Sequence, residues 1–284
     1  MAEVPRPTDR VLVLGGGGVT GVAWELGLLL GLCEQGLDLT GADLIIGTSA
    51  GSVVAAQITS GTPLPELFEA QLRGYGAERP ARVGVGTIAR MVLASLGART
   101  ERDARARVGR MALSARTIPE AERRAVIASR LPTTTWPDRR VFITAVAVDD
   151  GEFVVFDRDS GVSLVDAVAA SCAVPGVWPP ATINGRCYID GGMRSPANVH
   201  LAAGAGRVVV LAPIDRAFRR SNSVSAQVAA LPATTRACAI FPDAAARAAI
   251  GRNVLDPTRR AAAARAGRRQ AASALDRVAA VWRD

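Results

Sequence analysis

The fold is decided by one stretch, Leu44-Ile45-Ile46-Gly47-Thr48-Ser49-Ala50-Gly51-Ser52-Val53-Val54, in which a short apolar run leads into a helical pattern. The turn between them has the pattern G-x-S-x-G. A strand that enters a helix through so tight a turn projects the middle side chain outward, and the flanking Gly47 and Gly51 leave room for the crowded backbone. Ser49 is therefore a candidate nucleophile. So short a pattern also arises by chance, and the rest of the chain must supply a base and an oxyanion site.

A second strand–turn–helix unit precedes it. The apolar run Arg10-Val11-Leu12-Val13-Leu14 passes through four glycines into a helical pattern over residues 22–35. As G-x-G-x-x-G, this turn would suit a dinucleotide, and Asp38 and Asp43 lie near the spacing of a ribose-binding acid. In a hydrolase, its bare N–H groups would instead stabilise an oxyanion. The next strand ends in the serine turn, which favours the hydrolase, and both turns should meet at the carboxyl edge of one sheet.

The composition describes a globular protein with a basic surface. The chain has 284 residues, 49% of them hydrophobic, which suits one large α/β domain or two small ones. Its net charge is +8, and all 34 basic residues are arginine. They are mixed with acids, without aromatic–basic interleaving or a zinc pattern, so no specific nucleic-acid partner is expected. The two remaining interpretations are a basic face that meets anionic lipid headgroups and a solvated arginine-rich surface without a partner.

Several features bear on the compartment. The amino terminus lacks the basic start and apolar core of a signal peptide, and no apolar run approaches the length of a spanning helix. We therefore expect a cytoplasmic protein that touches membranes only peripherally, if at all; the sequence does not predict its oligomeric state. The cysteines are far apart and form no C-x-x-C pair, which indicates small core residues in a reducing compartment: Cys33, Cys172, Cys187 and Cys238.

Residues 63–132 have the pattern of a helical insertion on the sheet. It could cap the active site and supply a pocket for an acyl chain, or it could be packing. Its short apolar faces, such as Ile88, Met91, Val92 and Leu96, are expected to lie in the core rather than on a membrane. The predicted helices cover Leu64–Arg73, Thr87–Leu96, Glu101–Leu113 and Pro119–Arg130.

The next segment returns to strands. A buried strand over Arg140–Val148 turns into a second one over Glu152–Phe156, and a helix follows over Leu164–Ser171. Farther on, Asn184-Gly185 is a strong signal for a two-residue hairpin turn. The second hairpin strand runs directly into Asp190-Gly191-Gly192.

This hairpin delivers Asp190 at a strand end, and Gly191 and Gly192 let other groups approach it. A last strand is predicted over Arg207–Leu211. After Pro213 the chain is rich in alanine and arginine, and we expect helices that cover the sheet as far as Asp284.

A serine hydroxyl needs a general base, which is usually histidine. The chain has one histidine, His200, which lies in an apparent helix with no acid nearby to orient it. A Ser-His-Asp triad stays open in principle, but Asp190 is the better candidate. A carboxylate acts directly as the base when burial raises its proton affinity and the serine lies close.

Four stretches in the same order resemble the patatin-like phospholipases, acyl hydrolases with a Ser-Asp dyad. They are the glycine turn, the serine turn, Asp190-Gly191-Gly192 and Ala170-Ser171-Cys172-Ala173-Val174-Pro175-Gly176-Val177-Trp178-Pro179-Pro180. The resemblance implies Ser49 as nucleophile, Asp190 as base, and neither metal nor cofactor. It also implies a three-layer α/β/α sandwich with a mostly parallel sheet. The implied oxyanion hole consists of the N–H groups of Gly16, Gly17, Gly18 and Val19.

The resemblance predicts a single domain over residues 1–284, with a catalytic core over 10–212, the insertion over 63–132 and a helical cover over 213–284. The predicted activity is hydrolysis of fatty-acyl esters by a lipase, phospholipase A or carboxylesterase. The alternatives are a transacylase that uses the same site and a non-catalytic lipid-binding scaffold. Two departures from the family pattern stand out: Thr20 occupies a position that is usually Arg or Lys, and Ser195-Pro196-Ala197-Asn198 reverses the usual order of asparagine and proline.

Overall fold

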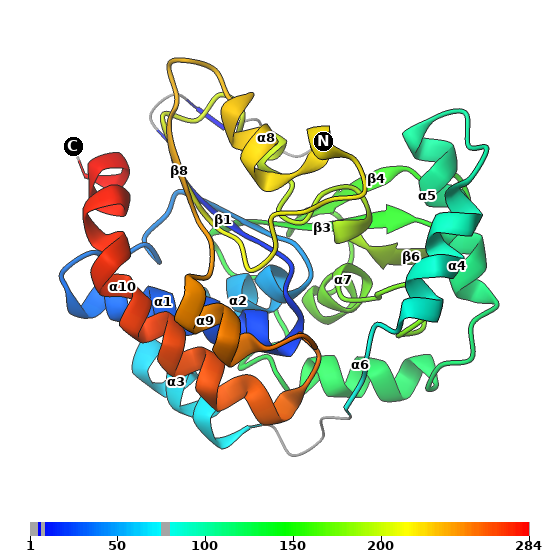
Figure 1. Ribbon diagram of the computed structural model, residues 1–284, viewed down its shortest axis with the longest axis horizontal. Coiled ribbons are helices and arrows are strands. Elements are labelled where there is room, and N and C mark those ends of the chain that lie inside the picture. The colour runs from blue at the N-terminus through cyan, green and yellow to red at the C-terminus, as the bar shows by residue number, and fades with distance from the viewer. Residues whose placement is uncertain (1–4, 7–8, 75–79, 284) are drawn as a thin grey trace.

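The computed structural model describes residues 5–6, 9–74 and 80–283, which surround one central sheet (Figure 1). The strand order is β5-β6-β3-β2-β1-β7-β8, and β4 pairs with β3 off this path. The strands are β1 (Arg10–Leu14), β2 (Leu44–Gly47), β3 (Arg140–Ala147), β4 (Phe153–Phe156), β5 (Ala181–Ile183), β6 (Arg186–Asp190), β7 (Arg207–Leu211) and β8 (Arg236–Ile240).

The middle of the sheet is parallel. Strands β3, β2, β1, β7 and β8 run the same way, whereas β4, β5 and β6 pair antiparallel. Leu14 lies opposite Gly47 on one side and Leu211 on the other. The carboxyl ends of β1 and β2 are therefore level, so the turns that follow them meet at one edge of the sheet. The predicted α/β/α sandwich with a mostly parallel sheet is confirmed.

Helices cover both faces of the sheet, unequally. Most lie on one face, together with α1, whereas α8 and a short 3-10 turn over Val199–Ala202 pack on the other (Figure 1). The helices are α1 (Gly18–Glu34), α2 (Ala50–Ile58), α3 (Leu64–Arg73), α4 (Val85–Ser95), α5 (Glu101–Leu113), α6 (Glu120–Ala128), α7 (Leu164–Ser171), α8 (Val224–Ala229), α9 (Ala244–Ile250) and α10 (Arg260–Trp282). None of the helices in the described residues is long and apolar enough to cross a bilayer.

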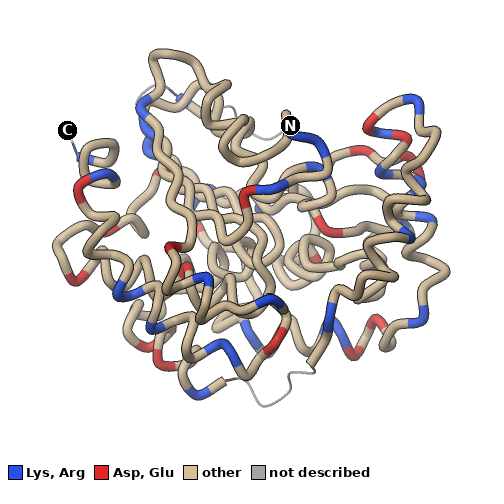
Figure 2. Tube along the Cα trace, in the orientation of Figure 1, with Lys and Arg blue, Asp and Glu red and all other residues tan. Residues whose placement is uncertain are grey.

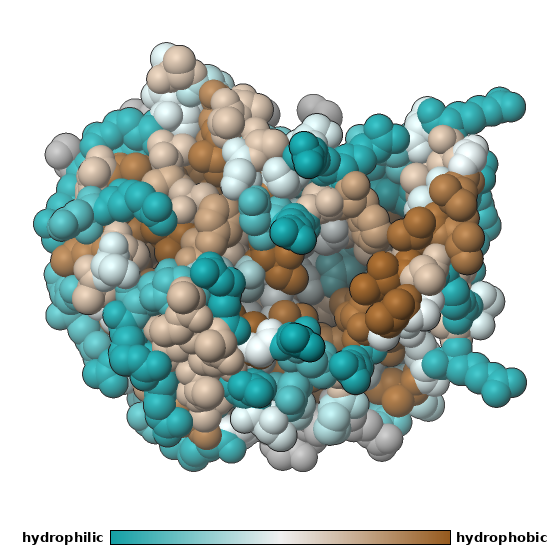
Figure 3. All heavy atoms as spheres, viewed as in Figure 1, coloured by the Kyte–Doolittle hydropathy of each residue, from teal (hydrophilic) through white to brown (hydrophobic). Residues whose placement is uncertain are grey.

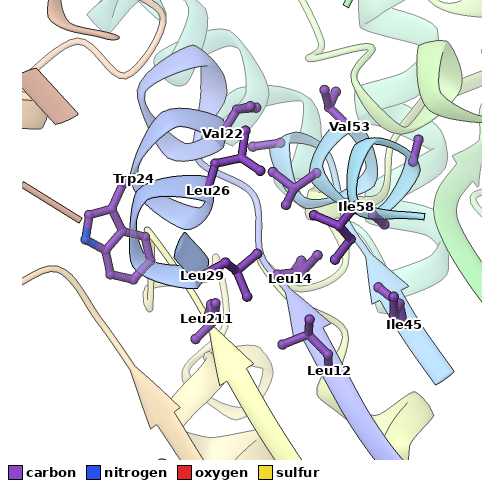
Figure 4. Packing of buried hydrophobic residues seen from close by; sticks show 14 of the residues in the cluster. Leu12, Leu14, Val22, Trp24, Leu26, Leu29, Ile45, Val53, Ile58 and Leu211 are labelled. Carbon is purple, nitrogen blue, oxygen red and sulfur yellow. The ribbon is translucent and has the colours of Figure 1, made fainter. Parts of the chain in front are cut away.

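Alternating side chains on the strands build two cores. Leu12 and Leu14 of β1 point toward α1 and α2, where Leu26 and Val53 meet them (Figure 4). Their neighbours on β1, such as Val13, join the core on the opposite face. A strand buried on both faces reads as a continuous apolar run, which is why these strands were visible in the sequence.

Helices α1 and α10 approach closely because small residues lie between them. A Cβ on Gly27 would lie 2.1 Å from the carbonyl oxygen of Ala264, and one on Gly267 would lie 2.2 Å from that of Trp24. The Trp24 indole Nε1 donates a hydrogen bond of 2.9 Å to Gln270 of α10. Helix α1, which begins in the glycine turn, is thus held between the sheet and the C-terminal helix.

Two expectations from the sequence were wrong. The segment after Pro213 is not helical throughout, because Arg236–Ile240 forms β8 and pairs parallel with β7. Its alanines favour a helix by propensity, but the open edge of β7 supplies backbone partners that override this preference. In the insertion, Met91 is buried as expected, whereas Ile88, Val92 and Leu96 are exposed. The period of an amphipathic helix does not tell whether a partner covers its apolar face.

The closeness of α1 and α10 predicts the effect of Gly27→Ala. Alanine normally stabilises the interior of a helix by about 1 kcal/mol relative to glycine. Here the new methyl group would meet a backbone carbonyl, and overpacking of this kind costs about 1–3 kcal/mol. Urea unfolding should therefore show a net loss of stability. Gly41→Ala is the control, since nothing lies within 4 Å of that Cβ position. A Gly27→Ala protein as stable as wild type would contradict the close packing.

Candidate active site

The serine turn follows β2 directly and holds Ser49 in an unusual conformation. Its φ of 53° and ψ of −114° lie in a region that non-glycine residues rarely adopt. Two contacts hold it there: the Ser49 N–H donates to Ser171 Oγ at 2.9 Å, and the Ser52 hydroxyl donates to the Ser49 carbonyl at 2.6 Å. The side chain is consequently fixed at the start of α2, with 8% of the residue exposed.

The serine turn and the glycine turn are fastened to each other. The Gly51 N–H donates to the Gly15 carbonyl at 2.9 Å, and the Thr48 N–H donates to the Leu14 carbonyl at 3.0 Å. A Cβ on Gly51 would lie 2.1 Å from the Leu14 oxygen, so only glycine fits. Gly47 and Gly51 therefore have the role that the sequence indicated, which is to let the backbones approach.

Asp190 is the last residue of β6 and lies opposite Ala145 of β3. Its carboxylate accepts hydrogen bonds from the Ser49 hydroxyl and from the Gly192 N–H, the latter at 2.7 Å. Burial raises the pKa of Asp190 to about 6, against the opposing effects of these hydrogen bonds and of the positive charge of Arg123. The structure thus brings together the two residues that the sequence singled out.

The glycine turn provides fewer free donors than predicted. Gly16 is a correction, because its N–H already donates to the Pro196 carbonyl at 2.7 Å. In the part of the chain that the structure describes, the N–H groups of Gly17, Gly18 and Val19 donate to no other group. They lie at the amino end of α1, where the helix dipole favours negative charge. These three groups are therefore the available oxyanion donors.

Asn198 is a residue that sequence reasoning missed. It is buried, with a left-handed φ of 50°, and its amide nitrogen donates to Thr48 Oγ1 at 3.1 Å, Thr144 Oγ1 at 3.3 Å and the Gly191 carbonyl at 3.3 Å. Asn198 thus ties the serine turn to the strand end that carries Asp190. Its displacement from the usual place relative to proline was the only signal.

Glu25 is a second missed residue. It lies fully buried on α1, where its Oε1 accepts a hydrogen bond of 2.9 Å from the Gly15 N–H. Burial raises its pKa well above the usual value. Glu25 therefore anchors the glycine turn in its neutral form. The signal in the sequence was an acid inside an otherwise apolar helix.

His200 lies in a different environment from Ser49 and Asp190. Its Nε2 is 2.6 Å from Nη1 of Arg194, and its ring packs on Phe153 with 5.4 Å between centroids. Burial and the charge of Arg194 lower the pKa of His200 to about 4. An imidazole so weakly basic and held by an arginine is poorly suited to accept a proton at neutral pH.

Two hollows flank the Ser49–Asp190 pair. A cavity of about 20 Å³ lies at Ser49, and a larger one of about 320 Å³ begins at Met193, three residues after Asp190. The larger cavity has an apolar lining from α4, α5 and the loop after β7. The small one is lined by Gly18, Val19, Arg123, Arg130, Cys172 and Trp178.

This geometry coincides with a sequence match. The family model described as "Patatin-like phospholipase" matches residues 12–203, which include both turns and the Asp190 strand end. The chain belongs to the patatin-like phospholipase family. At the level of the family it is thus a lipid acyl hydrolase. No curated protein matches the sequence significantly.

Two solved structures resemble this patatin-like chain weakly. VipD from Legionella pneumophila is 15% identical, with a TM-score of 0.49; the match covers 96% of this chain and 67% of VipD. The type III effector ExoU, which another structure assigns to Pseudomonas aeruginosa, is 18% identical with a TM-score of 0.43. That match covers 96% of this chain and 54% of the ExoU chain, so this chain spans about half the length of ExoU.

The raised pKa of Asp190 predicts that Asp190→Asn stabilises the protein. A carboxyl group with a pKa near 6 in the folded state and near 4 in the unfolded state reduces stability once both states are ionised. The penalty is absent below about pH 4, grows as the pH rises to about 6, and then stays constant. Its size is at most about 3 kcal/mol. Urea unfolding from about pH 5 to 8 should show this growing advantage.

The exposed Asp159 provides the matched control. Asp159→Asn should change the free energy of unfolding little at any pH. An Asp190→Asn protein whose stability follows wild type over the same pH range would show that burial does not penalise this carboxylate.

Proposed function

We propose that the chain is a serine acyl hydrolase, of the lipase, phospholipase A or carboxylesterase type, that cleaves fatty-acyl esters through Ser49 and Asp190. One observation carries the proposal: the Ser49 hydroxyl donates a hydrogen bond to a buried carboxylate with a pKa of about 6. Such a group is ionised at neutral pH and is more basic than an exposed aspartate. It therefore can accept the serine proton without a histidine between them.

In the first half of the reaction, Ser49 Oγ attacks the ester carbonyl carbon, and its proton passes to Asp190. The negative charge that forms on the carbonyl oxygen accepts hydrogen bonds from the N–H groups of Gly17, Gly18 and Val19. One such donor typically lowers the barrier by about 3 kcal/mol. The intermediate collapses, the ester C–O bond breaks, and the leaving alkoxide takes the proton from Asp190.

The second half releases the fatty acid. Water attacks the acyl-Ser49 carbonyl and gives its proton to Asp190, and the same donors hold the second oxyanion. As this intermediate collapses, Ser49 leaves and recovers the proton from Asp190. The amino ends of α1 and α2 both lie at the reacting centre, and their dipoles favour the negative charge in each step.

The dyad predicts that Ser49→Ala and Asp190→Asn each lower the kcat/KM for p-nitrophenyl butyrate by a factor of about 1,000 or more. In the wild-type protein, kcat/KM should fall as the pH drops below about 6, because Asp190 becomes protonated. His200→Ala is the control and should keep its activity. Full activity in either dyad variant, or a dead but folded His200→Ala protein, would refute the assignment.

We further propose that α4 meets an anionic lipid surface. Its exposed face supports this: Val85, Ile88, Val92, Leu93 and Leu96 form an apolar surface beside the hollowed centre of the molecule (Figure 3). Apolar side chains gain about 2 kcal/mol each when they enter lipid. Basic and acidic residues are interspersed along much of the chain (Figure 2), but the arginines near this patch add attraction to anionic headgroups. They are Arg82, Arg90, Arg99, Arg219 and Arg220.

The lipid contact is tested with two exposed leucines. Leu93 on α4 is 65% exposed, and Leu113 on α5 is 54% exposed. Leu93→Ser should weaken binding to phosphatidylserine-containing vesicles about tenfold, since it removes buried apolar area. Leu113→Ser should bind as wild type in the same cosedimentation assay. Equal binding by both variants would exclude α4 as the contact.

A further inference from the structure

Arg123 is a buried cation that the proposed reaction does not use. It lies on α6, lines the small cavity at Ser49, and is 6% exposed. Its guanidinium stacks on the Trp178 ring, with 4.0 Å from Cζ to the ring centroid. Within the described residues, its Nε has no hydrogen-bond partner and no ion pair joins it to a carboxylate.

A buried guanidinium in this state is unfavourable. It carries five N–H donors, and taking its charge out of water costs free energy unless an anion and hydrogen bonds compensate. Burial, together with the charge of Arg130, lowers the pKa of Arg123 to about 10, so the group stays protonated at neutral pH. Arg130 lines the same cavity. Two cations at one cavity increase the demand for an anion there.

The two hollows beside the catalytic pair differ in a way that suits the two sides of an ester. The cavity at Arg123 has about 20 Å³, enough for a water-sized polar group but not for an alkyl chain. The hollow at Met193 has about 320 Å³ and an apolar lining from residues such as Val92, Leu96 and Phe218. An acyl chain therefore fits on the Met193 side, and a compact anionic group fits on the Arg123 side.

We propose that Arg123, with Arg130 beside it, forms a phosphate subsite that selects esters carrying a phosphate on the alcohol side. The inference rests on the proposed function for the position of the ester at Ser49. The planar guanidinium binds phosphate oxygens through two parallel hydrogen bonds, which a single ammonium cannot reproduce. The substrate class is then a glycerophospholipid, whose phosphate lies a few bonds from the acyl ester.

Two other roles for Arg123 make different predictions. If its charge only keeps Asp190 ionised, its loss raises the pKa of Asp190 and slows every ester alike. If it only packs on Trp178, its loss destabilises the fold. A phosphate subsite instead changes the selection between esters and the binding of phosphate itself. The matched control is Arg124→Gln, one position along α6, where an exposed arginine pairs with Asp166.

The first measurement is phosphate binding without catalysis. Inorganic phosphate is titrated calorimetrically into the Ser49→Ala protein and into the same protein with Arg123→Gln or Arg124→Gln. Arg123→Gln should weaken binding at least tenfold, whereas Arg124→Gln should stay within twofold. Unchanged affinity in the Arg123→Gln protein overturns the subsite. This result holds even if the chain hydrolyses no ester, so a failure of the proposed function is recognised separately.

The second measurement compares two esters. The ratio of kcat/KM for dihexanoyl phosphatidylcholine to that for p-nitrophenyl butyrate should fall at least tenfold in Arg123→Gln and recover in part in Arg123→Lys. An equal loss on both esters with a shifted acid limb assigns Arg123 to Asp190 and overturns the proposal. Lost phosphate binding with an unchanged ratio indicates a site for free phosphate, which also overturns the role in selection.

Thermal unfolding completes the test. The Arg123→Gln protein should melt at the same temperature as wild type or higher, because a buried charge has been removed. A clearly lower melting temperature in both Arg123→Gln and Arg123→Lys, with the ester ratio unchanged in Arg123→Lys, would mark a packing role and overturn the proposal.

Discussion

The hydrogen bond from the Gly51 N–H to the Gly15 carbonyl is the contact on which the site depends. It joins the turns after β1 and β2, which the parallel register brings level at the edge of the sheet. Because a side chain at position 51 would collide with the Leu14 oxygen, the turns approach only when this residue is glycine. The approach sets Ser49 against the amino end of α1. The reacting serine and the oxyanion donors thus owe their relation to backbone geometry.

The charges at the site are kept at a cost in stability. Asp190 is buried as an anion next to a serine, and Arg123 is buried as a cation without a contacting carboxylate. Each would be replaced by a neutral residue if only folding mattered. Their separation leaves Asp190 with a pKa near 6, whereas direct contact with an arginine would lower the pKa and weaken the base. A phosphate at Arg123 would neutralise that charge and make the carboxylate a stronger base when substrate is present.

Local patterns predicted the elements well, and contacts between distant segments explain what they missed. The apolar runs of β1 and β2 and the Asn184-Gly185 hairpin announce themselves within a few residues, so both turns and Asp190 could be named in advance. The N–H of Gly16 is occupied by Pro196, far along the chain, which no local pattern reveals. For the same reason β8 was taken for helix. Arg123 looked like a solvated residue because the sequence does not show which side of α6 faces the cavity.

The packing of α1 under α10 has a consequence for the order of events during synthesis. The glycine turn is held from above by Val254, whose carbonyl accepts a hydrogen bond of 3.2 Å from the Thr20 N–H, and α1 is covered by a helix that ends at Trp282. A ribosome releases these segments last. The nascent chain therefore carries Ser49 and Asp190 before it can hold the oxyanion loop in place. Competence to attack an ester arises only when the whole chain has emerged, which protects nearby bilayers from a half-made lipase.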